Sequence, residues 1–308
     1  MIAAARPRLA YDDCTHEVLS DLSLRHGVDA ATMLFHDCIR TAPRNRAIVA
    51  ALDRTAAAAV PDGARGANGK ILIAPALFYR ERPDIGGDGA VVQAAARAAG
   101  LRVELLPVAS GGTARQNAAT IRDLLAAHCD RPTVLVSLSK GTADVRLAFE
   151  SMPALPRNLT AWVNVSGLAH GTPAIDRLMS RWWSRLALRT LLARHRAPFE
   201  LTREFTASGR SPLNTPAQAP RGLLTINLIA CPLSHHLSSR FGRIRHRQMA
   251  HLGPNDGLTL LRDAIVEPGL VYPVLGADHY FRSAEVPRII ARLLAFLQSQ
   301  GCFSSERM

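Results

Sequence analysis

The 308-residue sequence has few aromatic residues, few cysteines and no long apolar run. Aromatic residues make up 5% of the chain and charged residues 20%, whereas 48% of the residues are hydrophobic. These proportions exclude an intrinsically disordered chain, a collagen-like chain and a disulfide-rich scaffold. No apolar stretch reaches the ~18 residues needed to span a bilayer, and residues 1–9 lack the apolar core of a signal peptide. We therefore expect a soluble protein of the reducing cytoplasm.

The five cysteines are odd in number and widely spaced, and none forms a Cys-x-x-Cys pair. This pattern predicts neither a disulfide framework nor a zinc site. A group of histidines in the C-terminal third shares no metal-ligand spacing and has no acidic neighbours: His235, His236, His246 and His251. We expect no metal and no cofactor.

The cations are almost all arginine, since only Lys70 and Lys140 are lysines among 37 basic residues. With 25 acidic residues the formal net charge is +12. Such a balance is compatible with a nucleic acid or an anionic membrane surface as partner. Because the basic residues lack interleaved stacking aromatics and no nucleic-acid-binding motif is present, we expect no nucleic-acid partner. The abundance of arginine and alanine is also typical of a GC-rich genome.

From residue 70 onward, short apolar runs alternate with segments of helical periodicity. The expected strands lie at 71–74, 103–106, 134–136, 162–165, 223–229 and 270–274. The expected helices include 89–99, 114–128, 142–151 and 285–297. Nearly continuous apolar strands that alternate with helices predict an α/β fold, with a mostly parallel sheet flanked by helices on both faces.

Two segments depart from this alternation. Residues 1–66 have apolar positions three and four apart and predict an N-terminal helical extension, which the turn residues Pro61-Asp62-Gly63, Gly66 and Gly69 separate from a main domain at 67–308. Residues 167–221, between two expected strands, are long and helical, and insertions of this size are usually a cap or lid over a site.

The strongest local motif is Ser-x-Ser-x-Gly at 137–141, where an apolar strand runs directly into a helix. A serine on such a sharp turn is exposed above the sheet edge, and small residues are needed on both sides of it because backbone segments come close together. Ser139 is therefore a candidate nucleophile, with Ser137 in the place that glycine usually fills. The alternative is that Ser139 is only a helix N-cap.

Two downstream motifs supply an acid and a base. Asp256 lies in Asn-Asp-Gly after the strand at 223–229, and His279 directly follows the strand at 270–274. The chain order Ser139, Asp256, His279 is the order expected for a catalytic triad on an α/β sheet. Asp263 and Asp278 are rival acids, although Asp278 is adjacent to the histidine and less able to face its ring. Asp256 could instead be a turn residue, and His279 a surface histidine.

These motifs, with a further similarity at 165–173, resemble the α/β-hydrolase superfamily and, within it, bacterial lipase- and esterase-like members over about residues 70–300. The resemblance implies an acyl-enzyme on Ser139, with His279 as base and Asp256 as its orienting acid. It also implies an oxyanion hole from the backbone N–H of Lys140 and of Leu77, in a loop where Pro-Ala-Leu-Phe replaces the His-Gly motif of the family. His170, in the 165–173 segment, is interpreted as structural.

The predicted cap carries arginines every four residues, at Arg177, Arg181, Arg185 and Arg189, which would place them on one helix face. Trp182 and Trp183 belong to the adjacent apolar stripes and are candidate substrate or lid residues. Such a helix could meet lipid or an anionic substrate, or it could be an ordinary cap helix with solvated arginines.

We thus expect a serine hydrolase that cleaves a carboxylic ester or thioester of a hydrophobic, small-molecule or lipid-like acyl substrate, with peripheral membrane contact through the basic cap as a further expectation. An acyltransferase or C–C hydrolase on the same fold, or a non-catalytic binding protein, are the alternatives. Acyl-chain length and oligomeric state do not follow from the sequence.

Overall fold

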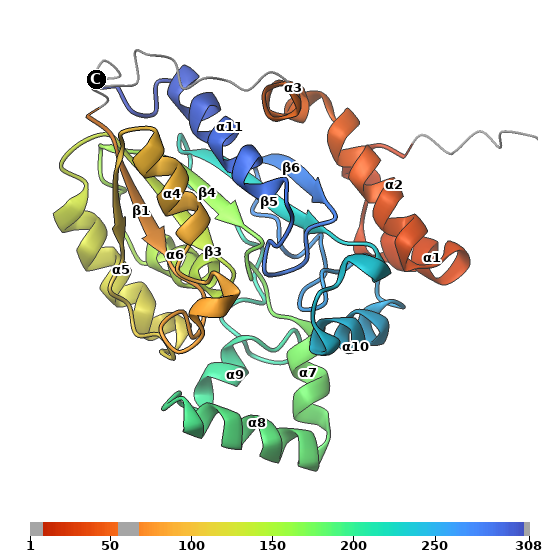
Figure 1. Ribbon diagram of the computed structural model, residues 1–308. Helices are drawn as coiled ribbons and strands as arrows, with labels where there is room; N and C mark the ends of the chain where they lie inside the picture. Colours follow the sequence, from red (N-terminus) through yellow and green to blue (C-terminus); the bar gives the residue numbers. More distant parts are fainter. Residues whose placement is uncertain (1–8, 55–67, 305–308) are drawn as a thin grey trace, which may run out of the picture.

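The computed structural model describes residues 9–54 and 68–304, and its six strands form one parallel sheet in the order β2-β1-β3-β4-β5-β6 (Figure 1). The strands are β1 (Lys70–Ala74), β2 (Arg102–Leu105), β3 (Thr133–Leu138), β4 (Leu159–Val165), β5 (Leu224–Cys231) and β6 (Leu270–Leu275). The predicted α/β class is confirmed, with a parallel sheet, a helical cap and an N-terminal helical extension. The expected boundary near residue 66 lies outside the described residues.

Helices cover both faces of the sheet, which explains why the strands are apolar almost throughout. Every residue of β1 and β3 is buried. Ile71 and Ile73 of β1 face one helix layer, and Leu72 and Ala74 face the other. The first layer contains α3 (Arg46–Asp53), α4 (Ala90–Ala98) and α11 (Val286–Ser299), and the second contains α5 (Ala114–His128) and α6 (Lys140–Glu150).

The N-terminal helices α2 (Val28–Thr41) and α3 lie beside β6, at one edge of the sheet, and α1 (His16–His26) packs on α2 (Figure 1). Asn45, between α2 and α3, accepts a 2.9 Å hydrogen bond from the backbone N–H of Val271 in β6. Its amide nitrogen donates to the Ile39 carbonyl at 2.9 Å. The extension therefore occupies hydrogen-bonding groups that an exposed edge strand would offer to another chain.

The cap lies between β4 and β5 and consists of α7 (Pro173–Ser180), α8 (Trp182–Arg194) and α9 (Glu200–Glu204), drawn below the sheet in Figure 1. Its apolar side packs on α5 and α6, where Leu192, Leu201 and Phe205 join Ala114 and Ala143 in one cluster. The cap thus has a small core of its own against the sheet-covering helices.

A buried arginine fastens the two ends of the cap to α6. The guanidinium of Arg146, 1% exposed, donates to the carbonyls of Ala169, Leu213 and Thr215 at 2.6, 3.2 and 2.8 Å. His170 adds a second link, because its ring bonds the Asp263 carbonyl at 2.9 Å and accepts from another cap-segment N–H.

The predicted single helix face of arginines is wrong in one respect. The chain is extended at Arg181, with φ −109° and ψ 132°, so Arg177 lies on α7 while Arg185 and Arg189 lie on α8. The hydroxyl of Ser184 donates to carbonyls at the end of α7, those of residues 178 and 181, at 2.7 and 3.0 Å. This local side-chain bond offers the backbone an alternative to a continuous helix.

Within the described residues no helix is both long enough and apolar enough to cross a bilayer.

Candidate active site

The turn between β3 and α6 holds Ser139 in a conformation that is rare for a residue with a side chain. Its φ is 48° and its ψ −117°, and α6 begins at the next residue. Positive φ is strained for a non-glycine residue and is tolerated where the surroundings enforce it. A Cβ on Gly141 would lie 2.4 Å from the Ala74 carbonyl oxygen, so only glycine lets α6 pack this close to the end of β1.

A buried polar network supports this turn where the usual glycine is absent. The hydroxyl of Ser137 lies 2.9 Å from that of Thr142 in α6 and accepts a 2.9 Å hydrogen bond from the indole of Trp162. Thr142 in turn donates to Asn164 at 2.8 Å, and Asn164 donates to Asn227 at 2.8 Å. Side-chain bonds across β3, β4 and β5 therefore fix both sides of the turn.

Ser139, His279 and Asp256 form a continuous hydrogen-bonded chain. The Oγ of Ser139 lies 2.8 Å from Nε2 of His279, and Nδ1 of the same ring lies 2.7 Å from Oδ2 of Asp256. The second oxygen of Asp256 accepts the N–H groups of Leu258 and Thr259 at 2.9 and 2.8 Å, which holds the carboxylate in place. The predicted nucleophile, base and acid are thus brought together.

The electrostatics of His279 are set by two opposing effects. Burial alone would lower the pKa of its imidazole, but the charge of Asp256 and the hydrogen bond to it outweigh burial. The resulting pKa of His279 is raised above its usual value, with a further contribution from Asp278. The negative charge of Asp256 therefore stabilises the protonated form of the imidazole in this site.

The two rival acids are engaged elsewhere. Asp278 accepts the hydroxyl and the backbone N–H of Ser238 and the N–H of Tyr280, so its carboxylate holds the loop that carries His279. Asp263 lies 2.6 Å from Nε2 of His16 on α1. Within the described residues, neither carboxylate is hydrogen-bonded to the His279 ring.

Two backbone donors lie at the places expected for an oxyanion hole. Lys140 is the first residue of α6, where backbone N–H groups have no acceptor inside the helix. Leu77 lines the same cavity as Ser139, and its N–H has no acceptor among the described residues, whereas its neighbours Ala76 and Phe78 donate to Gly87 and Ser110. The ammonium of Lys140 is buried and paired with both oxygens of Asp144 at 2.6 and 2.8 Å.

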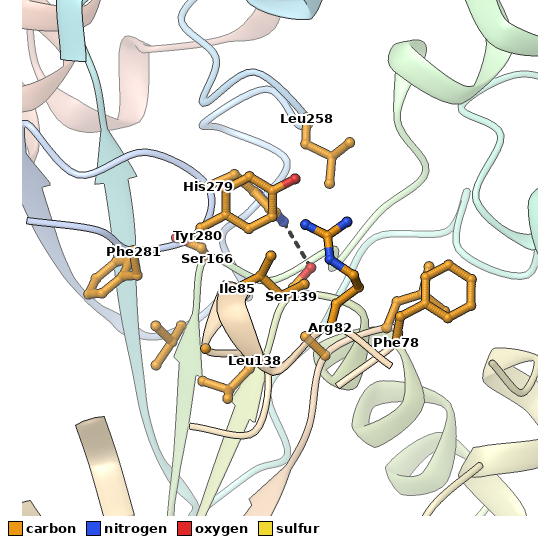
Figure 2. Close-up of a pocket in the computed structure, with 15 residues that line it drawn as sticks. Phe78, Arg82, Ile85, Leu138, Ser139, Ser166, Leu258, His279, Tyr280 and Phe281 are labelled. Atoms are coloured by element: carbon orange, nitrogen blue, oxygen red, sulfur yellow. Dashed lines mark hydrogen bonds between the residues drawn. The ribbon is translucent and has the colours of Figure 1, made fainter. Parts of the chain in front are cut away.

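Ser139 and His279 open into a cavity of about 220 Å³ whose wall is mainly apolar (Figure 2). In Figure 2 the guanidinium of Arg82 points toward this pair, and Arg82 is itself held by both oxygens of Asp84 at 2.8 Å. The other walls come from the loop after β1, the end of β4 and the residues after His279. The wall residues outside the predicted site include Phe78, Arg82, Ile85, Leu138, Val165, Ser166, Leu258, Tyr280 and Phe281.

Most of these wall residues could not be identified from the sequence, because they lie in loops without a motif. Ser166 is an exception in principle, since it directly follows β4 and so must lie at the same sheet edge as Ser139. It is 2% exposed, has φ 42°, and its hydroxyl has no hydrogen-bond partner among the described residues.

The candidate lid residues Trp182 and Trp183 do not line this cavity. They lie on α8 with side chains 79% and 54% exposed. Arg185 and Arg189 of the same helix contact Phe199 within the cap, with their guanidinium carbons 5.8 and 5.7 Å from the centre of its ring. The cap contacts the site indirectly, through Phe78 of the cavity wall, whose ring lies 4.6 Å from that of His195.

Within residues 9–54 and 68–304, no three His, Cys, Asp or Glu side chains are grouped so that they could hold a metal ion. Cys14, Cys38, Cys129 and Cys231 form no disulfide within the described residues.

No protein-family model matches the sequence, and no curated protein matches it. Solved structures do match. A metagenomic carboxyl esterase, MGS0156, is similar over 76% of each chain at 20% identity with a TM-score of 0.54. The mature form of the Bacillus licheniformis lipase BlEst2 is similar over 77% of this chain and 92% of its own at 17% identity, with a TM-score of 0.50. With its parallel sheet, cap and serine turn, the chain therefore has the α/β-hydrolase fold.

Proposed function

We propose that this protein is a serine hydrolase that cleaves a carboxylic ester or thioester of a hydrophobic acyl group through an acyl-enzyme on Ser139. The observation that carries the proposal is the chain of 2.8 and 2.7 Å hydrogen bonds from Ser139 through His279 to Asp256, on a strained strand-to-helix turn. The esterase and lipase named above are consistent with it, but at 20% and 17% identity their similarity supports the fold alone.

In the proposed acylation step, His279 removes the proton from Ser139 as its Oγ attacks the acyl carbon. The ring then gives that proton to the leaving alkoxide or thiolate as the bond to it breaks. The raised pKa of His279 favours the protonated ring that forms in this step, and the Asp256 carboxylate opposite Nδ1 keeps the ring in the required orientation.

The tetrahedral intermediate carries a negative oxygen that needs preorganised donors. We assign this role to the backbone N–H groups of Lys140 and Leu77, because neither has an acceptor among the residues that the structure describes. The positive end of α6 adds to the stabilisation. Water then attacks the acyl-enzyme with His279 as base, which releases the acid and restores Ser139.

Steady-state hydrolysis of p-nitrophenyl esters and of acyl thioesters tests the proposal. We expect turnover by the wild type and its loss in Ser139→Ala, with an unchanged circular dichroism spectrum. Product analysis in the presence of a competing alcohol separates hydrolysis from acyl transfer, because only transfer gives a new ester. Full activity in Ser139→Ala would reject the proposal.

A further inference from the structure

A second cavity, of about 390 Å³, adjoins the one into which Ser139 opens. It lies between the loop that leads into α4, the start of α11 and the residues after His279. The two cavities share wall residues, namely Ile85, Gly86, Leu138, Val165, Tyr280 and Phe281. Because one set of side chains bounds both spaces, the two cavities meet at this shared wall.

The lining of the second cavity is apolar inside and polar at its rim. Val92 of α4 and Val286 and Ile290 of α11 are buried in its wall. The charged wall residues Asp84 and Arg282 are exposed and joined to each other, since the Arg282 guanidinium donates to the Asp84 carbonyl at 3.0 Å. A concave apolar wall with a few polar groups is typical of small-molecule sites.

Phe281 lines both cavities, two residues after the catalytic histidine. Its φ is 56°, in the left-handed region that a bulky residue avoids. Its ring packs against the core layer that contains α4 and α11. Backbone strain of this kind persists where the surroundings enforce it and is concentrated at functional sites.

We propose that the second cavity binds the distal part of a linear, medium- to long-chain acyl group whose carbonyl carbon lies at Ser139. The inference rests on the proposed function. Leu77 follows β1, and Gly141, next to Lys140, packs against the end of β1, so the proposed donors would hold the carbonyl oxygen on this side. The acyl chain would then run past Leu138 and Val165, beside Ile85 and Phe281, which line both cavities. A short acyl group would not reach the apolar wall that α4 and α11 form in the second cavity.

The proposal predicts that a bulky side chain at the outer end of the cavity shortens the preferred acyl chain. Val91 is in the first turn of α4, lines the cavity and is 40% exposed, so Val91→Trp adds bulk without disturbing the core. The matched control is Ala98→Trp, on an exposed position of the same helix seven residues further on and outside the cavity wall.

The measured quantity is the ratio of kcat/KM for p-nitrophenyl dodecanoate to that for p-nitrophenyl butyrate. Burying one methylene contributes about fourfold to binding, so excluding several methylenes should lower the ratio at least tenfold in Val91→Trp. Ala98→Trp should keep the wild-type ratio. An unchanged ratio in Val91→Trp would overturn the assignment of this cavity.

A binding experiment makes the test independent of turnover. Fluorescence titration with cis-parinaric acid, in the Ser139→Ala background, should show saturable binding that weakens at least tenfold when Val91→Trp is added and stays unchanged with Ala98→Trp. If the wild type hydrolyses no ester but this pattern holds, the proposed function fails while the acyl site stands. Absence of binding, or equal binding by both double variants, would overturn the acyl site.

Discussion

The hydroxyl of Ser139 lies 2.8 Å from Nε2 of His279, although 140 positions separate the two residues in the chain. They follow β3 and β6, which are not neighbours in the sheet, because β4 and β5 lie between them. The contact is possible because the carboxyl ends of parallel strands share one edge, and the loop after β6 extends back along that edge. The topology of the sheet, rather than any local motif, therefore brings the proposed nucleophile and its proposed base together.

Replacing the acid should distinguish Asp256 from its rival Asp263. In Asp256→Asn the 2.7 Å contact with Nδ1 of His279 no longer carries a charge, and we expect kcat to fall by roughly 10³ to 10⁴. Asp263→Asn is the matched control, because that carboxylate bonds His16 instead, and it should retain near wild-type kcat. A larger loss in Asp263→Asn than in Asp256→Asn would contradict the assignment of the triad.

The pH profile should report the environment of His279. The base must be neutral to accept the proton of Ser139, so kcat/KM falls as the pH drops through the pKa of this ring. Burial acts to lower that pKa, but Asp256 raises it above the ordinary value of about 6.5. The acidic limb should therefore lie above that value in the wild type. In Asp256→Asn the limb should shift to lower pH, and a limb that does not move would argue against the pairing.

A backbone donor can be removed at Leu77 without changing any catalytic side chain. Proline has no N–H, so Leu77→Pro should lower kcat by roughly 10² to 10³ while KM changes much less. Leu77→Ala keeps the N–H and should stay within a few-fold of the wild type. Thermal unfolding of both variants establishes that the turn still folds. Equal losses in the two variants would show that the leucine side chain, not its N–H, matters.

The outer surface of α8 leads us to expect binding to anionic membranes. Trp182, Trp183, Leu186 and Leu191 are 49–79% exposed, and no acidic residue lies between 182 and 194. Basic helices with exposed aromatic side chains bind at the interface of anionic bilayers. The protein should co-sediment with phosphatidylglycerol vesicles more than with phosphatidylcholine vesicles, and less so at high salt.

The control for this experiment uses another exposed apolar side chain. Trp182→Ser combined with Trp183→Ser should abolish most of the sedimentation, whereas Leu24→Ser, at a residue of α1 that is 68% exposed, should not. Equal binding by both variants would refute a membrane contact through α8.

Much of the fold could be predicted because strands buried on both faces are apolar throughout, and all six expected runs overlap the observed strands. The proximity of Ser139, Asp256 and His279 could be predicted, because Ser139 and His279 come soon after strands, Asp256 lies in a later loop, and the chain order is characteristic. Which of Asp256, Asp263 and Asp278 contacts the His279 ring could not be predicted, since that contact depends on loop geometry rather than on sequence spacing.

Other features could not be predicted, for physical reasons. The periodicity of α8 indicates an apolar stripe but not what the stripe faces. The candidate substrate or lid residues Trp182 and Trp183 are exposed on the cap surface. At the break near Arg181 the Ser184 hydroxyl bonds two backbone carbonyls, a local interaction that competes with helix formation and that periodicity does not reveal. The walls contributed by Ile85 and Phe281 come from loops whose path is determined by tertiary packing.

The most direct test of the account is labelling with a fluorophosphonate, followed by intact-protein mass spectrometry. We predict stoichiometric labelling of the wild type and none of Ser139→Ala, because only a serine activated by His279 attacks the phosphorus. Ser166→Ala, which removes the neighbouring hydroxyl of the same cavity, should still be labelled. Labelling that persists in Ser139→Ala, or a folded wild type that never reacts, would contradict the account.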